Sequence, residues 1–137
     1  MADRLDIVLV NQIAEIDRLS GLLDRFVADH DVSSDAAYCV CLSLDEIVSN
    51  VIRHGYDHDR HEILVHLALD DGQMTVVVED EGRAFNPLEV PTPDFDRTIE
   101  ERGIGGLGIH IVRHMVDHLD YRREGNRNIL TLMKRTA

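Results

Sequence analysis

Two oxygen-bearing side chains stand one helical turn apart in the stretch LDEIVSNVIRHGY, residues 44–56. Glu46 and Asn50 are four residues apart, so on a helix they share one face. The apolar residues among them follow the helical period, and Gly55 suits the left-handed residue that often ends a helix. A carboxylate and an amide presented together suit a hard cation such as Mg²⁺, which takes one or two protein oxygens and leaves its other positions to water and phosphate. The pair alone is a weak signal, because E-x-x-x-N occurs often by chance.

Two further stretches supply parts that a nucleotide site needs. Asp80 ends an alternating strand, where its carboxylate could accept a hydrogen bond from the exocyclic amine of adenine. Gly82 would let the backbone approach the ring, because glycine has no Cβ. The glycines at 105, 106 and 108 run directly into a predicted helix, which leaves backbone N–H groups free for phosphates. No P-loop motif is present. The three stretches in this order predict a nucleotide site of another kind.

Length, charge and cysteine usage limit the class of protein. The chain has 137 residues and 44% hydrophobic residues, which predicts one globular domain with a real core. Its net charge of −12 disfavours nucleic acid and anionic lipid as partners, whereas a basic protein or a Mg²⁺-held phosphate fits. Cys39 and Cys41 do not face each other on a helix, so free thiols in a reducing cytosol are expected. The N-terminus lacks a long apolar run, so we predict a cytoplasmic protein without a signal peptide or membrane span.

The hydrophobic pattern predicts the elements that must position these residues. Alternation predicts strands over 5–9, 63–69, 74–78, 119–122 and 128–134, with Asp71-Gly72 as a hairpin turn. Helical periodicity predicts a first helix that Asn11 caps and that runs to about His30, and a second that Ser33 or Ser34 caps and that ends at Gly55. A third helix follows the glycines. The aperiodic stretch 88–103 predicts a long functional loop.

These motifs, in this order, resemble the GHKL superfamily of gyrase-type ATPases, Hsp90, histidine kinases and MutL. Within it, the 44–56 stretch, the short length and DEGRAFNP at 80–87 resemble the bacterial branch of anti-sigma factors and serine-protein kinases. The resemblance implies a two-layer α/β (α+β) sandwich of the Bergerat type, with a mixed, mostly antiparallel sheet and helices on one face. It implies a single histidine-kinase-like ATPase domain over 1–137, with a mobile ATP lid over about 86–104.

The resemblance also assigns roles to particular residues. It implies that Glu46 is the general base, that Asn50 ligates Mg²⁺ and that Asp80 reads adenine. Two departures from the family pattern are visible in the sequence: Ala84 replaces a second glycine, and the last turn lacks a Gly-Thr, so that Thr131 is the candidate for the adenine pocket. The remaining implied contacts to ATP come from His54, Gly82 and Ala84 and, around the phosphates, from Gly105, Gly106, Leu107 and Gly108.

Members of this branch phosphorylate a serine on an anti-anti-sigma (STAS) partner and bind a sigma factor in competition, a mode called partner switching. The resemblance therefore predicts an ATP-dependent serine/threonine-protein kinase and anti-sigma factor that uses ATP and Mg²⁺ and that could form a homodimer. The alternative is a nucleotide-gated protein-binding module without kinase activity. A structural domain without a ligand would require the three motifs to coincide by accident. A complete histidine kinase is excluded, because there is no room for its helical dimerisation segment.

Other polar residues have simpler interpretations. His110, His114 and His118 recur at helical spacing, but three ligands in one helical row seldom converge on a tetrahedral zinc ion. A boundary between core and solvent explains them better. Within the loop, Arg97 or Arg102 could reach a γ-phosphate, since arginine suits bidentate phosphate contacts.

Overall fold

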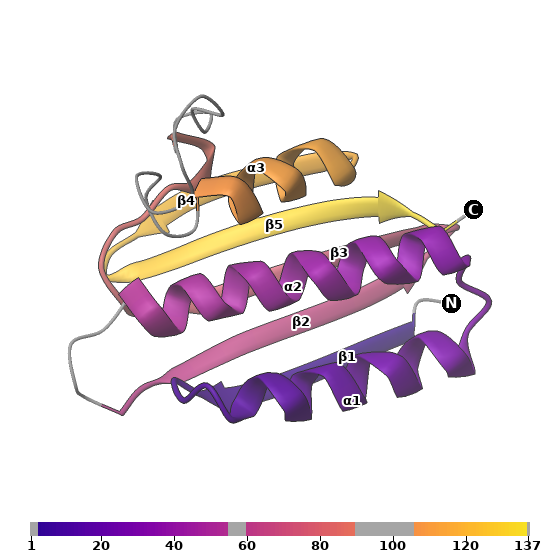
Figure 1. Ribbon diagram of the computed structural model, residues 1–137, viewed down its shortest axis with the longest axis horizontal. Helices are drawn as coiled ribbons and strands as arrows, with labels where there is room; N and C mark the ends of the chain where they lie inside the picture. Colours follow the sequence, from indigo (N-terminus) through magenta and orange to yellow (C-terminus); the bar gives the residue numbers. More distant parts are fainter. Residues whose placement is uncertain (1–2, 55–59, 90–105, 137) are drawn as a thin grey trace.

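In the described part of the chain, five strands of alternating polarity form one sheet, which three helices cover on one face (Figure 1). The computed structural model describes residues 3–54, 60–89 and 106–136. The strands lie in the order β1-β2-β3-β5-β4, and every pairing between the described strands is antiparallel. The predicted fold class is confirmed, although this sheet is antiparallel rather than mixed. The strands are β1 Asp3–Val10, β2 Glu62–Asp70, β3 Gln73–Asp80, β4 His118–Glu124 and β5 Arg127–Arg135.

The helices are α1 Glu15–Asp29, α2 Ser34–His54 and α3 Gly106–Met115, and a short 3₁₀ turn, η1, spans Pro87–Glu89. Ser33 caps α2 as predicted, because its Oγ accepts a hydrogen bond from the backbone N–H of Ala36 at 3.2 Å. The predicted cap at Asn11 is wrong, since α1 begins at Glu15. The Asn11 side chain accepts a hydrogen bond from the N–H of His61 at 2.8 Å instead, which ties the end of β1 to the start of β2.

The hairpin between β2 and β3 confirms the turn prediction. Asp71 and Gly72 have φ angles of 52° and 73°, and two positive values in a two-residue loop define a type I′ turn. The turn fixes the register, so that Val65 pairs with Val78 and Leu67 with Val76. These inward side chains are buried, and they form the core with buried residues of the helices: Leu19, Leu23, Val40, Leu44 and Val48.

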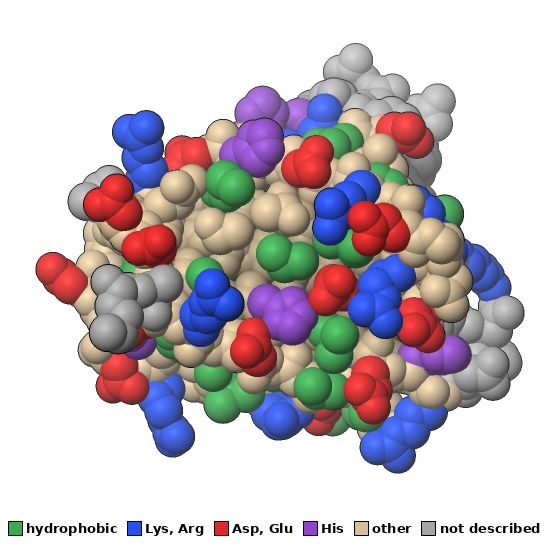
Figure 2. Space-filling model, turned by 180° about the vertical axis from the view of Figure 1, so that it is seen from behind, with side chains coloured by type: hydrophobic (Ala, Val, Ile, Leu, Met, Phe, Trp, Pro, Cys, Tyr) green, Lys and Arg blue, Asp and Glu red, His purple; other side chains and the backbone are tan. Residues whose placement is uncertain are grey.

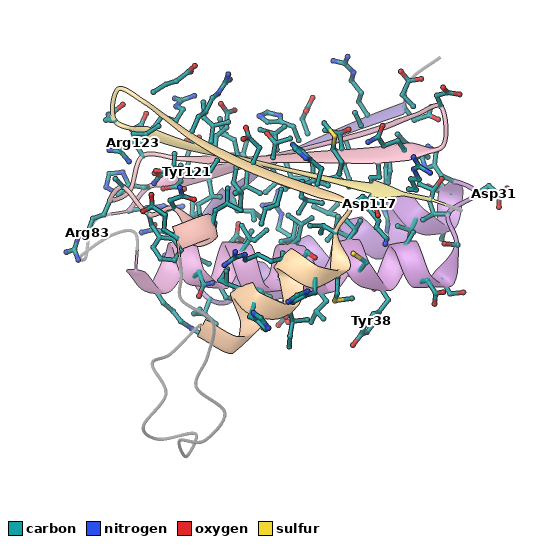
Figure 3. The ribbon with its side chains drawn as sticks, turned by 90° about the horizontal axis from the view of Figure 1, so that it is seen from above. Asp31, Tyr38, Arg83, Asp117, Tyr121 and Arg123 are labelled. Atoms are coloured by element: carbon teal, nitrogen blue, oxygen red, sulfur yellow. The ribbon has the colours of Figure 1, made fainter. Side chains whose placement is uncertain are left out.

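The connection from β3 to β4 shapes one end of the molecule. β3 and β4 both pair antiparallel with β5 and therefore run parallel to each other, so the chain must cross the sheet between them. It crosses on the helix face and includes η1 and α3 (Figures 1 and 3). The end of β3, the start of β5 and the end of β4 consequently meet near the C-terminal half of α2.

Candidate nucleotide site

Helix α2 places Asn50 at a pocket and Glu46 one turn before it. Asn50 is 5% exposed, and its Nδ2 has no hydrogen-bond partner among the described residues. An unpaired buried N–H donor is costly, so a hydrogen-bond acceptor brought to it would stabilise this site. Glu46 is half-buried and does not line the pocket itself. Its carboxylate packs against Gly108 in the first turns of α3, where a Cβ would overlap it.

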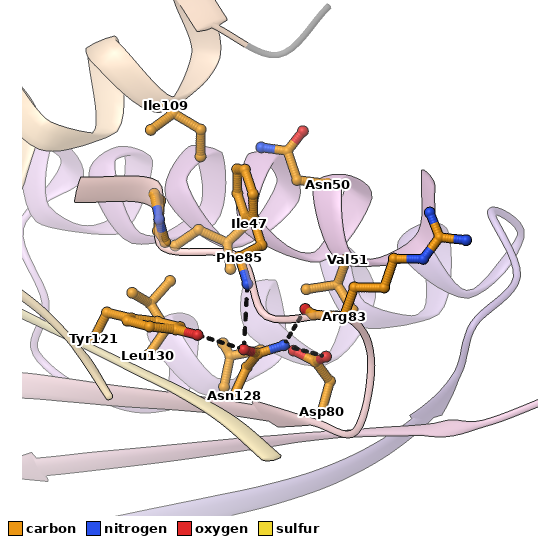
Figure 4. Close-up of a pocket in the computed structure, with 12 residues that line it drawn as sticks. Ile47, Asn50, Val51, Asp80, Arg83, Phe85, Ile109, Tyr121, Asn128 and Leu130 are labelled. Atoms are coloured by element: carbon orange, nitrogen blue, oxygen red, sulfur yellow. Dashed lines mark hydrogen bonds between the residues drawn. The ribbon is translucent and has the colours of Figure 1, made fainter. Parts of the chain in front are cut away.

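The end of β3 places Asp80 at the bottom of the same pocket. Its Oδ1 accepts hydrogen bonds from the N–H of Gly82 at 2.8 Å and from Asn128 Nδ2 at 3.0 Å (Figure 4). Burial raises the pKa of the Asp80 carboxyl above its usual value, while these two hydrogen bonds and the charge of Arg123 act in the opposite direction. A buried carboxylate with one oxygen already engaged can use its other oxygen for a ligand.

The pocket between these polar groups has apolar walls, which suits a planar base. Ile47 and Val51 contribute from α2, and Ile109 contributes from α3. Phe85 follows β3 and is 40% exposed at the mouth of the pocket. The rest of the lining is Asn50, Val78, Asp80, Arg83, Pro87, Tyr121, Asn128 and Leu130. Figure 4 shows that these residues come from α2, α3, the stretch after β3, and strands β3, β4 and β5.

Three predicted contacts need revision. Thr131 lies on the opposite face of β5 from the pocket residues Asn128 and Leu130, because side chains alternate along a strand. Ala84 is exposed and is not among the pocket-lining residues, whereas both of its chain neighbours are. Gly82 is buried, but its N–H binds Asp80 and its carbonyl accepts Arg123 Nη1 at 2.8 Å. These bonds fix the Asp80 loop and leave neither group for a base.

Several predicted residues lie outside what the structure describes. Gly105 and most of the predicted lid over 86–104 fall in the range 90–105, as do Arg97 and Arg102. His54, Gly106 and Leu107 are placed at helix ends, but their side chains are outside the described set. Gly106 and Gly108 do begin α3 as the predicted loop-to-helix junction requires. The phosphate role of these glycines stays a prediction.

The structure adds three polar residues to the site that belong to none of the sequence motifs: Asn128, Tyr121 and Arg123. Asn128 is 6% exposed and bonds to Asp80, and Tyr121 Oη donates to Asn128 Oδ1 at 2.6 Å. Arg123 Nη1 reaches the same oxygen at 3.1 Å. One signal was available in the sequence, because Asn128 shares its strand face with Leu130 and Leu132. A polar residue on an apolar face deserves a functional hypothesis.

The residues at this site fit a magnesium ion bound with a nucleotide. The oxygen of Asn50, Oδ1, is the atom that would ligate the ion. Its unpaired Nδ2 can only donate, so it suits an acceptor such as a phosphate oxygen or a water rather than a cation. Oxygen donors are what Mg²⁺ prefers, and it usually takes few of them from the protein. In the part of the chain that the structure describes, no group of three or more His, Cys, Asp or Glu side chains could hold a metal by itself.

The predicted row of three histidines on one helix is wrong, because α3 ends at Met115 and His118 begins β4. His110 and His114 contact each other edge to face, with ring centroids 4.5 Å apart, near the helix surface. Cys39 and Cys41 are free thiols, and burial raises the pKa of both. Among the described helices, none is long and apolar enough to cross a membrane.

The sequence profile of the histidine kinase-like ATPase domain matches residues 10–134. The chain therefore belongs to the histidine kinase-like ATPase domain family, the class that the fold and site indicate. Its similar relatives include a serine/threonine-protein kinase and several anti-sigma F factors. A serine/threonine-protein kinase, BtrW, of Bordetella bronchiseptica is 27% identical over 107 residues, covering 77% of this chain and 75% of the relative. The anti-sigma F factor of Geobacillus stearothermophilus is 27% identical over 111 residues, covering 80% and 76%. These relatives confirm the resemblance to the anti-sigma factor and serine-protein kinase branch.

Solved structures agree on the fold. The crystal structure of the RsbU and RsbW domains of Rv1364c from Mycobacterium tuberculosis superposes with a TM-score of 0.71 at 20% identity. The match covers 97% of this chain and 32% of that longer one. The histidine kinase domain of the blue-light activated kinase EL346 from Erythrobacter litoralis gives a TM-score of 0.56 at 20% identity, covering 90% and 60%.

Proposed function

We propose that this chain is an ATP-dependent serine-protein kinase that acts as an anti-sigma factor. The observation that carries the proposal is the convergence of Asn50 from α2 and Asp80 from β3 on one apolar pocket. Glu46 lies one helical turn from Asn50 and against the start of α3. The residues for base recognition, metal binding and proton transfer, Asp80, Asn50 and Glu46, then lie next to one another.

The reaction is transfer of the γ-phosphoryl group of ATP to a serine hydroxyl. Glu46 accepts the hydroxyl proton while the serine oxygen forms a bond to the γ-phosphorus. The bond from that phosphorus to the β–γ bridging oxygen breaks, which leaves ADP and phosphoserine. Asp80 holds the adenine, and the walls of the pocket exclude water from it. Asn50 would hold Mg²⁺, which when bound neutralises the charge on the phosphates. Catalysis is thus mainly positioning and charge stabilisation.

The partners follow from the relatives and from the charge. Relatives named anti-sigma F factor support a sigma factor as one partner, and the relative named serine/threonine-protein kinase supports a phosphorylated protein as another. That the phosphorylated protein is a STAS-domain anti-anti-sigma factor is what the family resemblance implies. The net charge of −12 would attract a basic region of a sigma factor. A homodimer is part of the proposal, as the family resemblance implies.

The deciding experiment separates ATP binding from transfer. Recombinant STAS-domain proteins from the same genome would be incubated with this chain, labelled ATP and Mg²⁺, and phosphoserine would be located by mass spectrometry. We expect Glu46→Gln to bind ATP normally in calorimetry and to lower transfer by about 10²- to 10⁴-fold. Asp45→Asn is the matched control, since it removes the same charge from the adjacent position of α2 and should leave transfer intact.

Two outcomes would contradict the proposal. Normal transfer by Glu46→Gln would exclude Glu46 as the base. A partner that binds tightly only with Mg²⁺-ATP, yet yields no phosphoserine, would favour the alternative of a nucleotide-gated binding module.

A further inference from the structure

Asn128 is a buried polar residue on the strand face that otherwise belongs to the core. It is the second residue of β5 and pairs directly with Asp80 at the end of β3. Leu130 and Leu132 continue the same face and are buried. Burying an amide on such a face is unfavourable unless its hydrogen bonds are made, so the contacts of Asn128 indicate its use.

Both ends of the Asn128 amide are fully used. Its Oδ1 accepts hydrogen bonds from Tyr121 Oη at 2.6 Å, from Arg123 Nη1 at 3.1 Å and from the N–H of Phe85 at 3.4 Å. Its Nδ2 donates to Asp80 Oδ1 at 3.0 Å and to the carbonyl of Arg83 at 2.8 Å. A guanidinium and a backbone N–H can only donate, so the oxygen must face them. The Nδ2 group must therefore face Asp80.

This orientation determines what Asp80 can offer to a ligand. Oδ1 already accepts two hydrogen bonds, from Asn128 and Gly82. Oδ2 accepts no hydrogen bond from the described residues. It is also not one of their fully buried polar atoms without a partner, so it is accessible from the pocket side. Because Asp80 lines the pocket, Oδ2 is the oxygen left for a bound base. An ionised carboxylate accepts only, so this position favours a donor on the ligand.

The same amide holds the loop beside the pocket. Asn128 contacts the backbone of Arg83 and Phe85, and Arg123 reaches the carbonyl of Gly82. Arg123 and Tyr121 both extend from β4, the strand beyond β5 (Figure 3). One side chain thus joins β3, β4, β5 and the loop that carries two pocket-lining residues.

We propose that Asn128 is a positioning residue that fixes Asp80 as a hydrogen-bond acceptor and so makes the pocket selective for a 6-aminopurine over a 6-oxopurine. A 6-amino group donates to the carboxylate, whereas a 6-oxo group places a second acceptor against it and leaves both unpaired. This inference rests on the proposed nucleotide site and adds the residue that sets its base preference.

The test compares Mg²⁺-ATP and Mg²⁺-GTP binding by titration calorimetry in wild type, Asn128→Asp and Tyr121→Phe. Asn128→Asp keeps the shape and the acceptor for Tyr121 and Arg123, but it turns an oxygen toward Asp80. We expect it to weaken ATP binding by about tenfold or more and to reduce the preference of ATP over GTP. Tyr121→Phe removes one donor to Asn128 and should give a smaller change in the same direction. Asn126→Asp, in the exposed turn between β4 and β5, adds the same charge as a control and should bind like wild type.

A pH profile separates positioning from a merely structural role. The Asn128 hydrogen bond lowers the pKa of Asp80, so Asn128→Asp should move the loss of ATP binding at acidic pH to a higher pH. The carboxyl carbon NMR shift of Asp80 would report the same change without nucleotide. Circular dichroism would establish that each variant is folded, and Tyr121→Phe decides the matter if Asn128→Asp does not fold.

The outcomes distinguish this inference from the proposed function. If wild type binds ATP but both variants keep its affinity, base preference and pH profile, Asn128 does not position Asp80. If wild type binds neither nucleotide, the nucleotide site itself is refuted and the inference with it. If the variants change as expected while no phosphoserine is ever found, the positioning role stands and the kinase activity fails.

Discussion

The substitution Gly108→Ala should displace the Glu46 carboxylate while changing the stability of the fold only slightly. A Cβ built at Gly108 would overlap the Glu46 carboxylate, with the carboxyl carbon only 2.6 Å away. Ordinary contact begins at 3.4 Å, so Gly108→Ala must move that carbon by at least 3.4 − 2.6 = 0.8 Å. The carboxylate is the far end of a flexible side chain, so it should move rather than the backbone.

The expected effects on stability and on transfer differ in size. Replacing glycine by alanine in a helix gains up to about 1 kcal/mol, and pushing a side chain off its rotamer costs about 0.5–1.5 kcal/mol. The free energy of unfolding should therefore change by less than about 1 kcal/mol, which is a Tm shift within about 4 °C. A catalytic group displaced by about 1 Å can lose about 10²-fold in rate, so phosphoryl transfer should fall by that order.

The assay measures thermal unfolding, ATP affinity and phosphoserine formation on the same preparations. Gly21→Ala in α1 is the matched control, because nothing lies within 4 Å of its Cβ position. It should gain stability and transfer normally. Transfer at the wild-type rate by Gly108→Ala would refute the reasoning about Glu46. A loss of ATP affinity as large as the loss of transfer would show instead that Gly108 acts on the phosphates.

Three further predictions follow from buried or paired polar groups. Asp80→Asn removes a carboxylate whose pKa is raised by burial, so the substitution should raise the Tm. It also turns an N–H donor toward the base, so calorimetry should show a loss of ATP binding and a relative gain for GTP. An unchanged preference for ATP over GTP would contradict this. Asn50→Leu should fold, because it removes an unpaired buried amide. ATP binding by this variant should lose its dependence on Mg²⁺. If the dependence is retained, the ion is held by other residues. On the open sheet face, where charged and apolar side chains intermingle (Figure 2), His66 bonds to Asp6 at 2.8 Å and to Glu79 at 3.0 Å, and the Asp6 bond chiefly raises its pKa. The stabilisation by protonated His66 is present below the ordinary pKa of 6.5 and is lost as pH rises through the raised pKa. The effect is small because the side chain is 39% exposed. Urea unfolding should show this pH dependence in wild type and not in His66→Gln.

Local pattern was enough to predict most of the elements. Strands were predicted because alternation has a period of two, and the Asp71-Gly72 turn because few residues accept two positive φ angles. Ser33 was predicted as a cap and is one. Asn11 has the same capping chemistry, but its side chain bonds to His61, fifty residues away. A local rule cannot foresee that competition, because the partner is brought close only by strand pairing.

The sequence by itself determined which side chains could serve a nucleotide. Glu46 and Asn50 share a helix face because of the helical period, and Asp80 ends a strand because the alternation stops there. Their common pocket depends on which strands pair and on where α2 crosses them, which no local pattern states. Only the tertiary structure showed that Asn128 faces Asp80 while Thr131 faces away, because a strand's register decides which of two alternating faces meets the pocket.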